Sequence, residues 1–321
     1  YKSVQTKRWK AMKRLLGPDT WLWMMTGTPA AQSPVDAFGL GKLCVPARCP
    51  NFFGRFRDMV MINAGRFKWV PKSDSENTVF SMLQPAVRFT KAECLDLPPV
   101  THVTREAPLT PQQNKYYKQL KKDMFITAAG EEISSVNAAV NLNKLLQISG
   151  GAVYSDDKQV IEFDVANRLS VIREVIEEAS NKVLVFVPFK HTIQLLKEYL
   201  DKHNATAEII NGDVLVKKRS QIFKAFQETP YPNVLIIQPQ AASHGVTLTA
   251  ADTIVWYAPV TSLETYLQAN ARIDRPGQTS NMTVVHISGS SVEKKLYSML
   301  QGKLKTHTKL IDLYKKEVEN A

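Results

Sequence analysis

The stretch Val183-Leu184-Val185-Phe186-Val187 is an unbroken run of five apolar residues. A run of this length without polar alternation is typical of a strand that is buried on both faces of a sheet. Further strands are predicted at 207–210, 234–237, 253–257 and 283–287, and helices with apolar spacing at 165–179, 193–200, 220–226 and 263–275. A C-terminal helical stretch is predicted from Val292. This alternation predicts an α/β fold with a doubly wound parallel sheet.

Residues before 164 do not continue this alternation. Prolines divide the region from Gly41 to Asp157 into short segments, in which helices are predicted at 111–127 and 136–148. Trp21 to Met25 is an apolar run that predicts a short buried strand ending at Thr26-Gly27-Thr28-Pro29. The pattern therefore divides the chain into residues 1–40, a mainly helical insertion and linker at 41–163, and the alternating region 164–321.

Charge is concentrated at one end of the chain. The 321 residues are 44% hydrophobic and 22% charged, which excludes disorder as the main state. Residues 1–72 hold 13 Lys or Arg and 3 Asp or Glu, whereas the other 249 residues hold 28 and 27. This excess favours a polyanionic partner such as a nucleic acid. Residues that could line such a path are Lys7, Arg8, Arg55, Arg57, Arg66 and Lys68.

The three cysteines, Cys44, Cys49 and Cys94, predict neither a disulfide framework nor a zinc site, because their number is odd and no ligand pairs lie nearby. No apolar run approaches the roughly 20 residues that span a bilayer. The first residues carry no secretory signal. We therefore expect a cytoplasmic protein.

The segment Gln268-Ala-Asn-Ala-Arg272-Ile-Asp-Arg275-Pro-Gly-Gln278 carries the strongest chemical pattern. On a helix, residues 268, 272 and 275 lie on one face, and Pro276 places Arg275 at the helix end. Two guanidinium groups match the charge that spreads over a transferring phosphoryl group. A solvated basic face is the alternative interpretation.

Five segments in order resemble motifs of the Swi/Snf-like branch of superfamily-two helicases. Residues 268–278 are similar to motif VI, 238–252 to motif V, 183–189 to motif IV and 24–29 to motif III. Residues 145–151 resemble the stretch before the second lobe. The sequences of motifs V and VI look most like those of phage-encoded members. The resemblance implies two RecA-like lobes with ATP between them and DNA across them. Residues 1–40 would then be the C-terminal remnant of the first lobe, and 164–321 the second lobe.

The resemblance also implies roles for individual residues. Arg272 and Arg275 would be arginine fingers on the ATP phosphates. The residues implied to bind ATP are Gly245, Thr247 and Gln268. The residues implied to couple ATP hydrolysis to lobe movement are Thr26, Gly27 and Thr28. The residues implied to contact DNA are Phe189, Lys190, Asn211, Gly212, Ser243 and His244. Thr247 stands where the family usually has Asn or Asp. Taken alone, Thr26 to Pro29 could be a turn, Phe189 a core residue, His244 a loop residue and Asn211-Gly212 a turn.

Two motifs of a complete motor are missing from this sequence. It contains no G-x-x-x-x-G-K-[ST] and no adjacent Asp-Glu pair that could hold Mg²⁺. We therefore expect the C-terminal part of a DNA-dependent ATPase or helicase that acts on duplex or branched DNA. Alone it would not hydrolyse ATP, because ATP and Mg²⁺ would be bound mainly by a first lobe supplied in cis or as a separate chain, and this chain would hold no metal.

Two other functions remain open from the sequence. One is a nucleic-acid-binding or regulatory module that has lost ATPase chemistry. The other is a nucleotide-binding or nucleotide-sugar-binding transferase on a doubly wound fold, since a fold does not determine a function. If the protein is phage-encoded, its location would be the host cytoplasm.

Overall fold

The structure is a computed structural model that describes residues 3–27, 29–30, 33–65, 69–89, 91–130, 135–154, 159–243 and 245–302. The chain forms two compact units, of which the first ends at Leu95 and the second begins at Asp96. Each unit has its own buried apolar cluster. In the described residues, no helix is long and apolar enough to cross a membrane.

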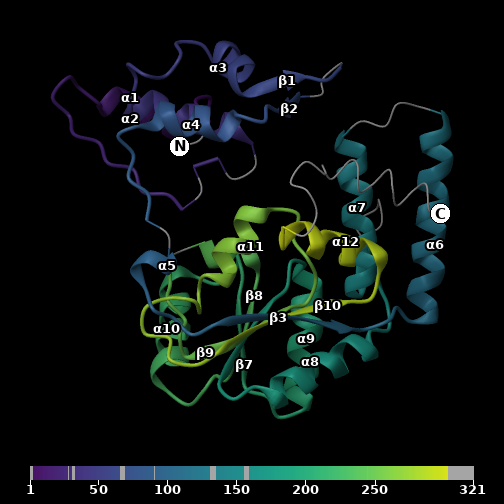
Figure 1. Cartoon of the computed structure of the whole chain (residues 1–321). Coiled ribbons are helices and arrows are strands. Elements are labelled where there is room, and N and C mark those ends of the chain that lie inside the picture. Colours follow the sequence, from purple (N-terminus) through teal and green to yellow (C-terminus); the bar gives the residue numbers. More distant parts are fainter. Residues whose placement is uncertain are drawn as a thin grey trace. The chain divides into compact units, whose positions relative to one another are not determined.

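The second unit is built on a six-stranded sheet in which every neighbouring pair of strands is parallel (Figure 1). In spatial order the strands are β3 (Val100–Glu106), β10 (Met282–Ser288), β9 (Ala251–Trp256), β6 (Lys182–Phe186), β8 (Val234–Ile237) and β7 (Ala207–Ile210). The apolar residues of β6 and β8 are at most 1% exposed because helices cover both faces. The predicted doubly wound parallel sheet is confirmed.

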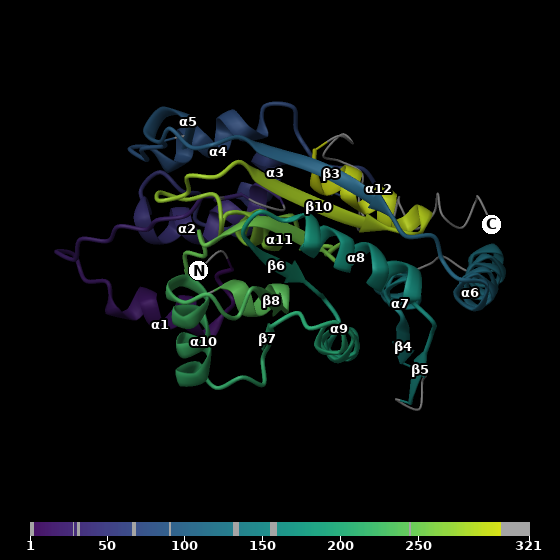
Figure 2. The same cartoon turned by 90° about the horizontal axis from the view of Figure 1, so that it is seen from below.

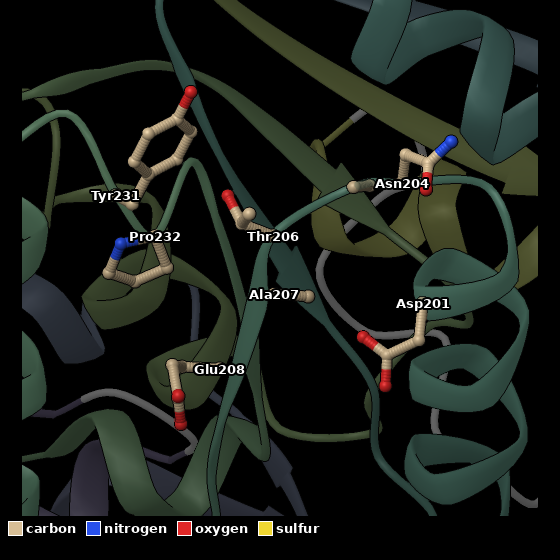
Figure 3. A pocket seen from close by; sticks show the side chains of 8 residues that line it. Asp201, Asn204, Thr206, Ala207, Glu208, Tyr231 and Pro232 are labelled. Carbon is tan, nitrogen blue, oxygen red and sulfur yellow. The ribbon is translucent and has the colours of Figure 1, made fainter.

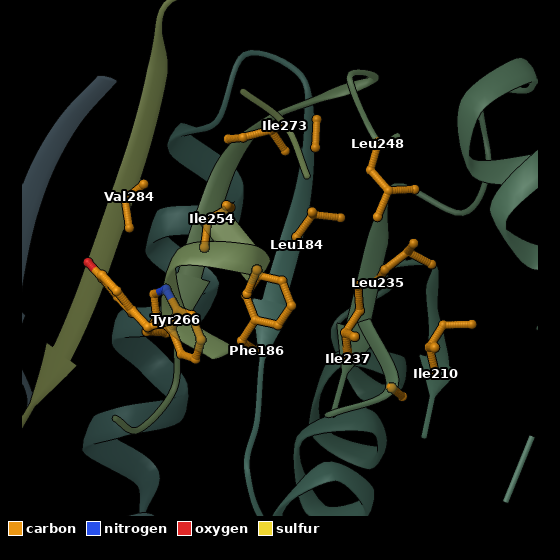
Figure 4. Packing of buried hydrophobic residues seen from close by; sticks show 14 of the residues in the cluster. Leu184, Phe186, Ile210, Leu235, Ile237, Leu248, Ile254, Tyr266, Ile273 and Val284 are labelled. Atoms are coloured by element: carbon orange, nitrogen blue, oxygen red, sulfur yellow. The ribbon is translucent and has the colours of Figure 1, made fainter. Parts of the chain in front are cut away.

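Alternate residues of β6 separate the two faces of the sheet. Leu184 and Phe186 join the cluster in Figure 4, which includes α10 (Val216–Glu228), α11 (Leu263–Asn270) and α12 (Ser291–Leu300). Val183 and Val185 face the other side, which is covered by α8 (Ala166–Glu178) and α9 (Lys190–Lys202). This two-sided burial explains why the strand sequences show no polar alternation.

A helix pair and a hairpin extend the second unit (Figure 2). They are α6 (Pro111–Gly130), α7 (Ser135–Gly150), β4 (Ala152–Tyr154) and β5 (Val160–Glu162). Gln113 Nε2 donates to the carbonyl of Ile148 at 2.7 Å and so joins α6 to α7. The Tyr257 hydroxyl donates to the carbonyl of Gly150 at 2.8 Å and joins α7 to the end of β9. Both helices that the sequence predicts here are confirmed.

Strand β3 lies in the region that the sequence predicts to be a mainly helical insertion and linker. All seven of its residues pair with β10, from Val100 opposite Met282 to Glu106 opposite Ser288. Its alternating polar residues obscured it, because a strand at a sheet edge keeps polar side chains in solvent. The domain boundaries predicted after residues 40 and 163 stay predictions. The sheet nevertheless includes β3, which precedes residue 163.

A buried ion pair holds α8 to α12. Arg168 Nη2 lies 2.8 Å from Glu293 Oε1 and 3.0 Å from Oε2, with side chains 3% and 0% exposed. Arg168 also donates to the carbonyl of Tyr257, and Glu293 accepts from the backbone N–H groups of Gly289 and Ser290 at 2.8 and 3.0 Å. Burial is the largest single influence on the pKa of Arg168 and lowers it, but the charge and hydrogen bond of Glu293, together with Tyr257 and Tyr297, raise that pKa above its ordinary value.

The first unit is mainly helical in the part that the structure describes. Its elements are α1 (Lys7–Leu15), a short 3₁₀ turn (Pro34–Asp36), α2 (Ala37–Cys44), α3 (Phe53–Val60), β1 (Met61–Asn63), β2 (Trp69–Pro71), α4 (Ser75–Leu83) and α5 (Lys91–Cys94). Trp9 anchors α1, because its ring is buried and its Nε1 donates to the carbonyl of Gly39 at 2.8 Å. The near-helical spacing of Trp9, Met12 and Leu16 predicts this helix from the sequence, and the structure confirms it.

The buried strand predicted at Trp21 to Met25 is wrong. This segment is neither strand nor helix, and Trp21, Trp23 and Met25 are 88%, 87% and 100% exposed. A strand needs a neighbour for its backbone hydrogen bonds, and among the described residues this segment pairs with none.

Candidate functional site

Both arginines of the predicted site lie in the turn that follows α11. The sequence predicts a helix from 263 to about 275, but α11 ends at Asn270. The expectation that residues 268, 272 and 275 share a helix face is therefore wrong. Pro276 disfavours helical geometry in the residue before it, and Gly277 has a φ of +96° that glycine adopts readily.

Gln278 fixes the far end of this arginine turn, which we define as residues 271–278. Its buried side-chain Nε2 donates to the carbonyl of Ala251 at 2.9 Å, and its Oε1 accepts from the N–H groups of Thr279 and Ser280 at 3.1 and 3.0 Å. In addition, the N–H of Leu248 donates to the carbonyl of Arg272 at 2.9 Å. These bonds hold the turn against the start of β9.

The turn brings four predicted residues together. Arg275 Nη1 donates to the carbonyl of Gly245 at 3.0 Å and lies 3.3 Å from the hydroxyl oxygen of Thr247. Arg272 is 4% exposed, and its Nη1 lies 3.4 Å from the carbonyl of Val246. Loop 245–247 and the turn therefore form one cluster, which joins the segments that resemble motifs V and VI.

Arg272 has the electrostatic properties of an anion site. Its Nε is buried without a hydrogen-bond partner in the described part of the chain, and no carboxylate among those residues forms an ion pair with Arg272 or Arg275. Burial lowers the pKa of Arg272, and the charge of Arg275 lowers it further. Buried cations normally have a counter-ion, so the residues present fit a phosphate group.

Gln268 does not join the arginine cluster. Its side chain is exposed on α11, where Nε2 donates to Glu264 Oε1 at 3.2 Å. Its assignment to ATP binding rests on the motif alone and stays a prediction. Among the described residues, no group of three or more His, Cys, Asp or Glu side chains could hold a metal ion.

The residues predicted to contact DNA follow the carboxyl ends of neighbouring strands. Lys190 comes after β6, and Asn211 and Gly212 come after β7, so parallel strands place them at one sheet edge. The Gly212 N–H lies 3.4 Å from Gln238 Oε1, which follows the intervening strand β8. Ser243 ends the 3₁₀ segment Pro239–Ser243 after β8, and His244 lies outside the described residues.

Phe189 occupies a packing position. It contacts two apolar clusters, and its ring lies against Gly150, with Cδ2 3.5 Å from where a Cβ of residue 150 would be. This placement matches the core alternative that the sequence left open. Its contact with DNA stays a prediction.

Two residues near the carboxyl ends of these strands were not predicted from the sequence as members of the site. Asp213 accepts from Lys190 Nζ at 2.8 and 2.9 Å, in a pair that is about half exposed or more on both sides. Arg219 Nη2 donates to the carbonyls of Asn211 and Val214, each at 3.0 Å. The helix was predicted to begin at 220, which left Arg219 outside it; α10 begins at Val216.

Residues predicted to couple hydrolysis to movement belong to the first unit. Thr26 and Gly27 follow the exposed apolar segment, and Thr28 lies outside the described residues, as do Arg66 and Lys68. Arg57 is not free, because its guanidinium lies 3.8 Å from the ring centre of Trp69 and pairs with Asp58 at 3.2 Å. The coupling role stays a prediction.

A pocket of about 620 Å³ lies at the start of β7 (Figure 3). Its walls include the carboxylates of Asp201 and Glu208 and the ring of Tyr231. Of the predicted site residues that the structure describes, none lines this pocket. Its acidic walls do not suit a phosphate.

The fold of the second unit is that of the second RecA-like lobe of Swi2/Snf2 ATPases. The crystal structure of the C-terminal part of the Fun30 ATPase domain covers 70% of this chain and 98% of its own length, with a TM-score of 0.56 at 13% identity. The Sulfolobus solfataricus SWI2/SNF2 ATPase core in complex with dsDNA matches all of this chain and 68% of its own, with a TM-score of 0.54 at 21% identity.

Residues 167–277 match the family described as "Helicase conserved C-terminal domain". Chromodomain-helicase-DNA-binding protein 1-like of Mus musculus is 27% identical over 90% of this chain and 33% of its own. SWI/SNF-related matrix-associated actin-dependent regulator of chromatin subfamily A-like protein 1 of Xenopus tropicalis is 25% identical over 95% of this chain and 32% of its own.

The chain thus spans about one third of the length of these curated relatives. Together the matches support the C-terminal portion of a Swi/Snf-type superfamily-two helicase. The resemblance to phage-encoded members stays a prediction.

Proposed function

We propose that this chain is the C-terminal part of an ATP-dependent DNA translocase or helicase, in which Arg272 and Arg275 contact the phosphates of ATP. The observation that carries the proposal is the buried Arg272 guanidinium, which lies beside Arg275 without a carboxylate partner in the described residues. It lies in a segment that matches a helicase domain. The relatives named as helicases support the same activity.

The division of labour follows from the chemistry of this chain. Phosphoryl transfer needs a phosphate-binding loop, a metal ion and cations that stabilise the developing charge. Arg272 and Arg275 supply the cations, and the Arg275 contacts with Gly245 and Thr247 orient its fork. A first RecA-like lobe, in cis or as a separate chain, would bind ATP with Mg²⁺, and Thr26, Gly27 and Thr28 would couple hydrolysis to its movement.

Reconstitution tests this proposal. The chain is combined with a polypeptide that supplies the first lobe, and ATP hydrolysis is measured with and without duplex DNA. We expect DNA-stimulated hydrolysis from the combination and none from this chain alone. An active combination that DNA does not stimulate would contradict the translocase function. The ATPase-inactive binding module predicts hydrolysis in no combination.

Duplex DNA is the proposed polyanionic partner, because the excess of Lys and Arg in residues 1–72 can neutralise its phosphates. We expect the affinity of the chain for a fluorescent duplex to fall at least tenfold between 50 and 200 mM salt, and to differ little between duplex sequences. Anisotropy titrations measure both effects. A salt-independent affinity would exclude a phosphate-based contact.

Asp213 should limit DNA affinity, because its carboxylate forms an ion pair with Lys190 and repels the phosphates of DNA. We expect Asp213→Asn to bind duplex DNA about threefold more tightly, since exposed ion pairs are weak and easily replaced. Glu228→Gln is the matched control, because it removes the same charge from an exposed pair with Lys224 at the other end of α10. Equal gains in both variants would show an effect of net charge alone.

A further inference from the structure

His286 is a fully buried histidine at the centre of a hydrogen-bonded group of side chains. It lies on β10 with 0% exposure. Its Nε2 is 2.8 Å from the hydroxyl oxygen of Tyr266 on α11, and its Nδ1 is 3.1 Å from Nε2 of Gln301, which follows α12. A neutral imidazole satisfies both contacts, because one ring nitrogen donates and the other accepts.

Tyr266 joins His286 to α11, whose last residue is Asn270. Figure 4 shows its ring among the apolar side chains, with the hydroxyl directed toward β10. Burial raises the pKa of Tyr266, and a hydrogen bond with the side chain of Asn270 lowers it. Asn270 Oδ1 also accepts from Trp256 Nε1 at 2.9 Å. Hydrogen bonds therefore run from Gln301 through His286 to Tyr266, which lies on the same helix as Asn270 and four residues before it.

Asn270 is connected directly to the arginine turn. It ends α11, and the next residues are Ala271 and Arg272. The N–H of Arg272 donates to the carbonyl of Ala269 at 3.1 Å, and Arg275 Nε donates to the carbonyl of Ala271 at 2.8 Å. A shift of the end of α11 would therefore move the Arg275 guanidinium through its own hydrogen bond and Arg272 through its backbone.

We infer that His286 is a positioning residue for Arg272 and Arg275, and that it transmits the position of α12 to the arginine turn. The hydrogen bonds to Tyr266 and Gln301 make the geometry of the turn depend on the end of α12. The consequence for ATP hydrolysis rests on the proposed function. The coupling itself does not, because it can be measured without nucleotide.

A matched pair of tyrosine variants tests the coupling. Tyr266→Phe removes the hydroxyl that joins His286 to α11 and keeps the ring. Tyr297→Phe removes another buried hydroxyl from the same cluster, which donates to the carbonyl of Trp256 on β9 at 3.1 Å and not to α11. Amide hydrogen exchange of the full chain, followed by mass spectrometry, then reports on residues 245–250 and 269–279.

In Tyr266→Phe we expect exchange in these peptides, which contain the amides of Leu248 and Arg272, to be about fivefold faster, the effect of one net hydrogen bond. In Tyr297→Phe it should be unchanged. Equal effects in both variants, or an unchanged turn in Tyr266→Phe, would overturn the inference.

Substitution of His286 itself separates hydrogen bonding from packing. His286→Gln keeps an amide that can reach Tyr266, so the arginine turn should stay protected from exchange. His286→Leu fills the space without a polar atom and should behave as Tyr266→Phe does. If glutamine fails to restore protection relative to leucine, the hydrogen bond is not what positions the turn.

The assembled motor gives an independent readout. There we expect Tyr266→Phe to lower kcat at least fivefold with little change in KM for ATP, because arginine geometry acts on the transition state. Absence of ATPase activity in every combination would reject the proposed function and leave the exchange result standing. Normal kcat with a loosened turn would reject the catalytic consequence alone.

Discussion

Replacing Arg272 by alanine should lower the DNA-stimulated ATPase of the assembled motor about a thousandfold, at the lower end of what arginine fingers contribute. The expected loss is large because Arg272 is buried and already free of carboxylates in the described residues, so its charge is available to the phosphates. Steady-state hydrolysis with saturating duplex measures it. Affinity for duplex DNA should change less than about twofold, since screened charges act over a short range.

Two further variants test whether the loss of hydrolysis is specific to the guanidinium of Arg272. Arg272→Lys should stay far below wild type, because a lysine provides one point charge in place of a planar fork. Arg105→Ala is the matched control: it removes an arginine of the same unit that lies on β3 and pairs with Glu178, and it should leave hydrolysis unchanged. Near-normal activity of both Arg272→Ala and Arg275→Ala would reject the arginine-finger assignment.

The largest expected effect on stability comes from Glu293→Gln. This change keeps the size of the side chain but leaves the Arg168 guanidinium buried without a counter-charge, and removing one partner of a buried pair costs about 3–5 kcal/mol. Urea unfolding of the second unit, followed by circular dichroism, should show a lower midpoint. The link between α8 and α12 would be lost with it.

The double variant Arg168→Met, Glu293→Gln tests the cause. It removes the unpaired charge while glutamine can still accept from Gly289 and Ser290, so it should recover about 2 kcal/mol relative to Glu293→Gln. Glu106→Gln breaks an exposed ion pair between β3 and Lys294, which follows Glu293 on α12. This change should lower the free energy of unfolding by less than about 1 kcal/mol. If the double variant is no more stable than Glu293→Gln, the buried charge is not the reason for the loss.

The core of the second unit was predictable because its strands are buried on both faces. Runs such as 183–187 and 234–237 leave no other placement for so many apolar side chains. Strand β3 was not predictable in this way, since its half-exposed, polar sequence gives no apolar run. The prediction of a strand at 21–25 failed for the opposite reason: this run is apolar, but it has no strand partner among the residues that the structure describes.

The sequence indicated four residues that the structure brings together, but not the geometry of the cluster that they form. The motifs indicated Arg272, Arg275, Gly245 and Thr247, which the structure brings together. Periodicity extended α11 beyond its end, because Ala271 and Ile273 continue an apolar spacing that the chain uses in a turn. Contacts that depend on distant segments, such as Lys190 with Asp213 or His286 with Tyr266, leave no pattern in the local sequence.

The pairing of β3 with β10 determines where this protein can be shortened. A truncated version beginning at residue 164 would lack β3 and leave the entire hydrogen-bonding edge of β10, seven residues long, open to solvent. Open edges of this length recruit strands from other molecules, so such a version should aggregate. A version beginning at Asp96 would keep the edge covered and is the piece to use for isolated study of the second unit.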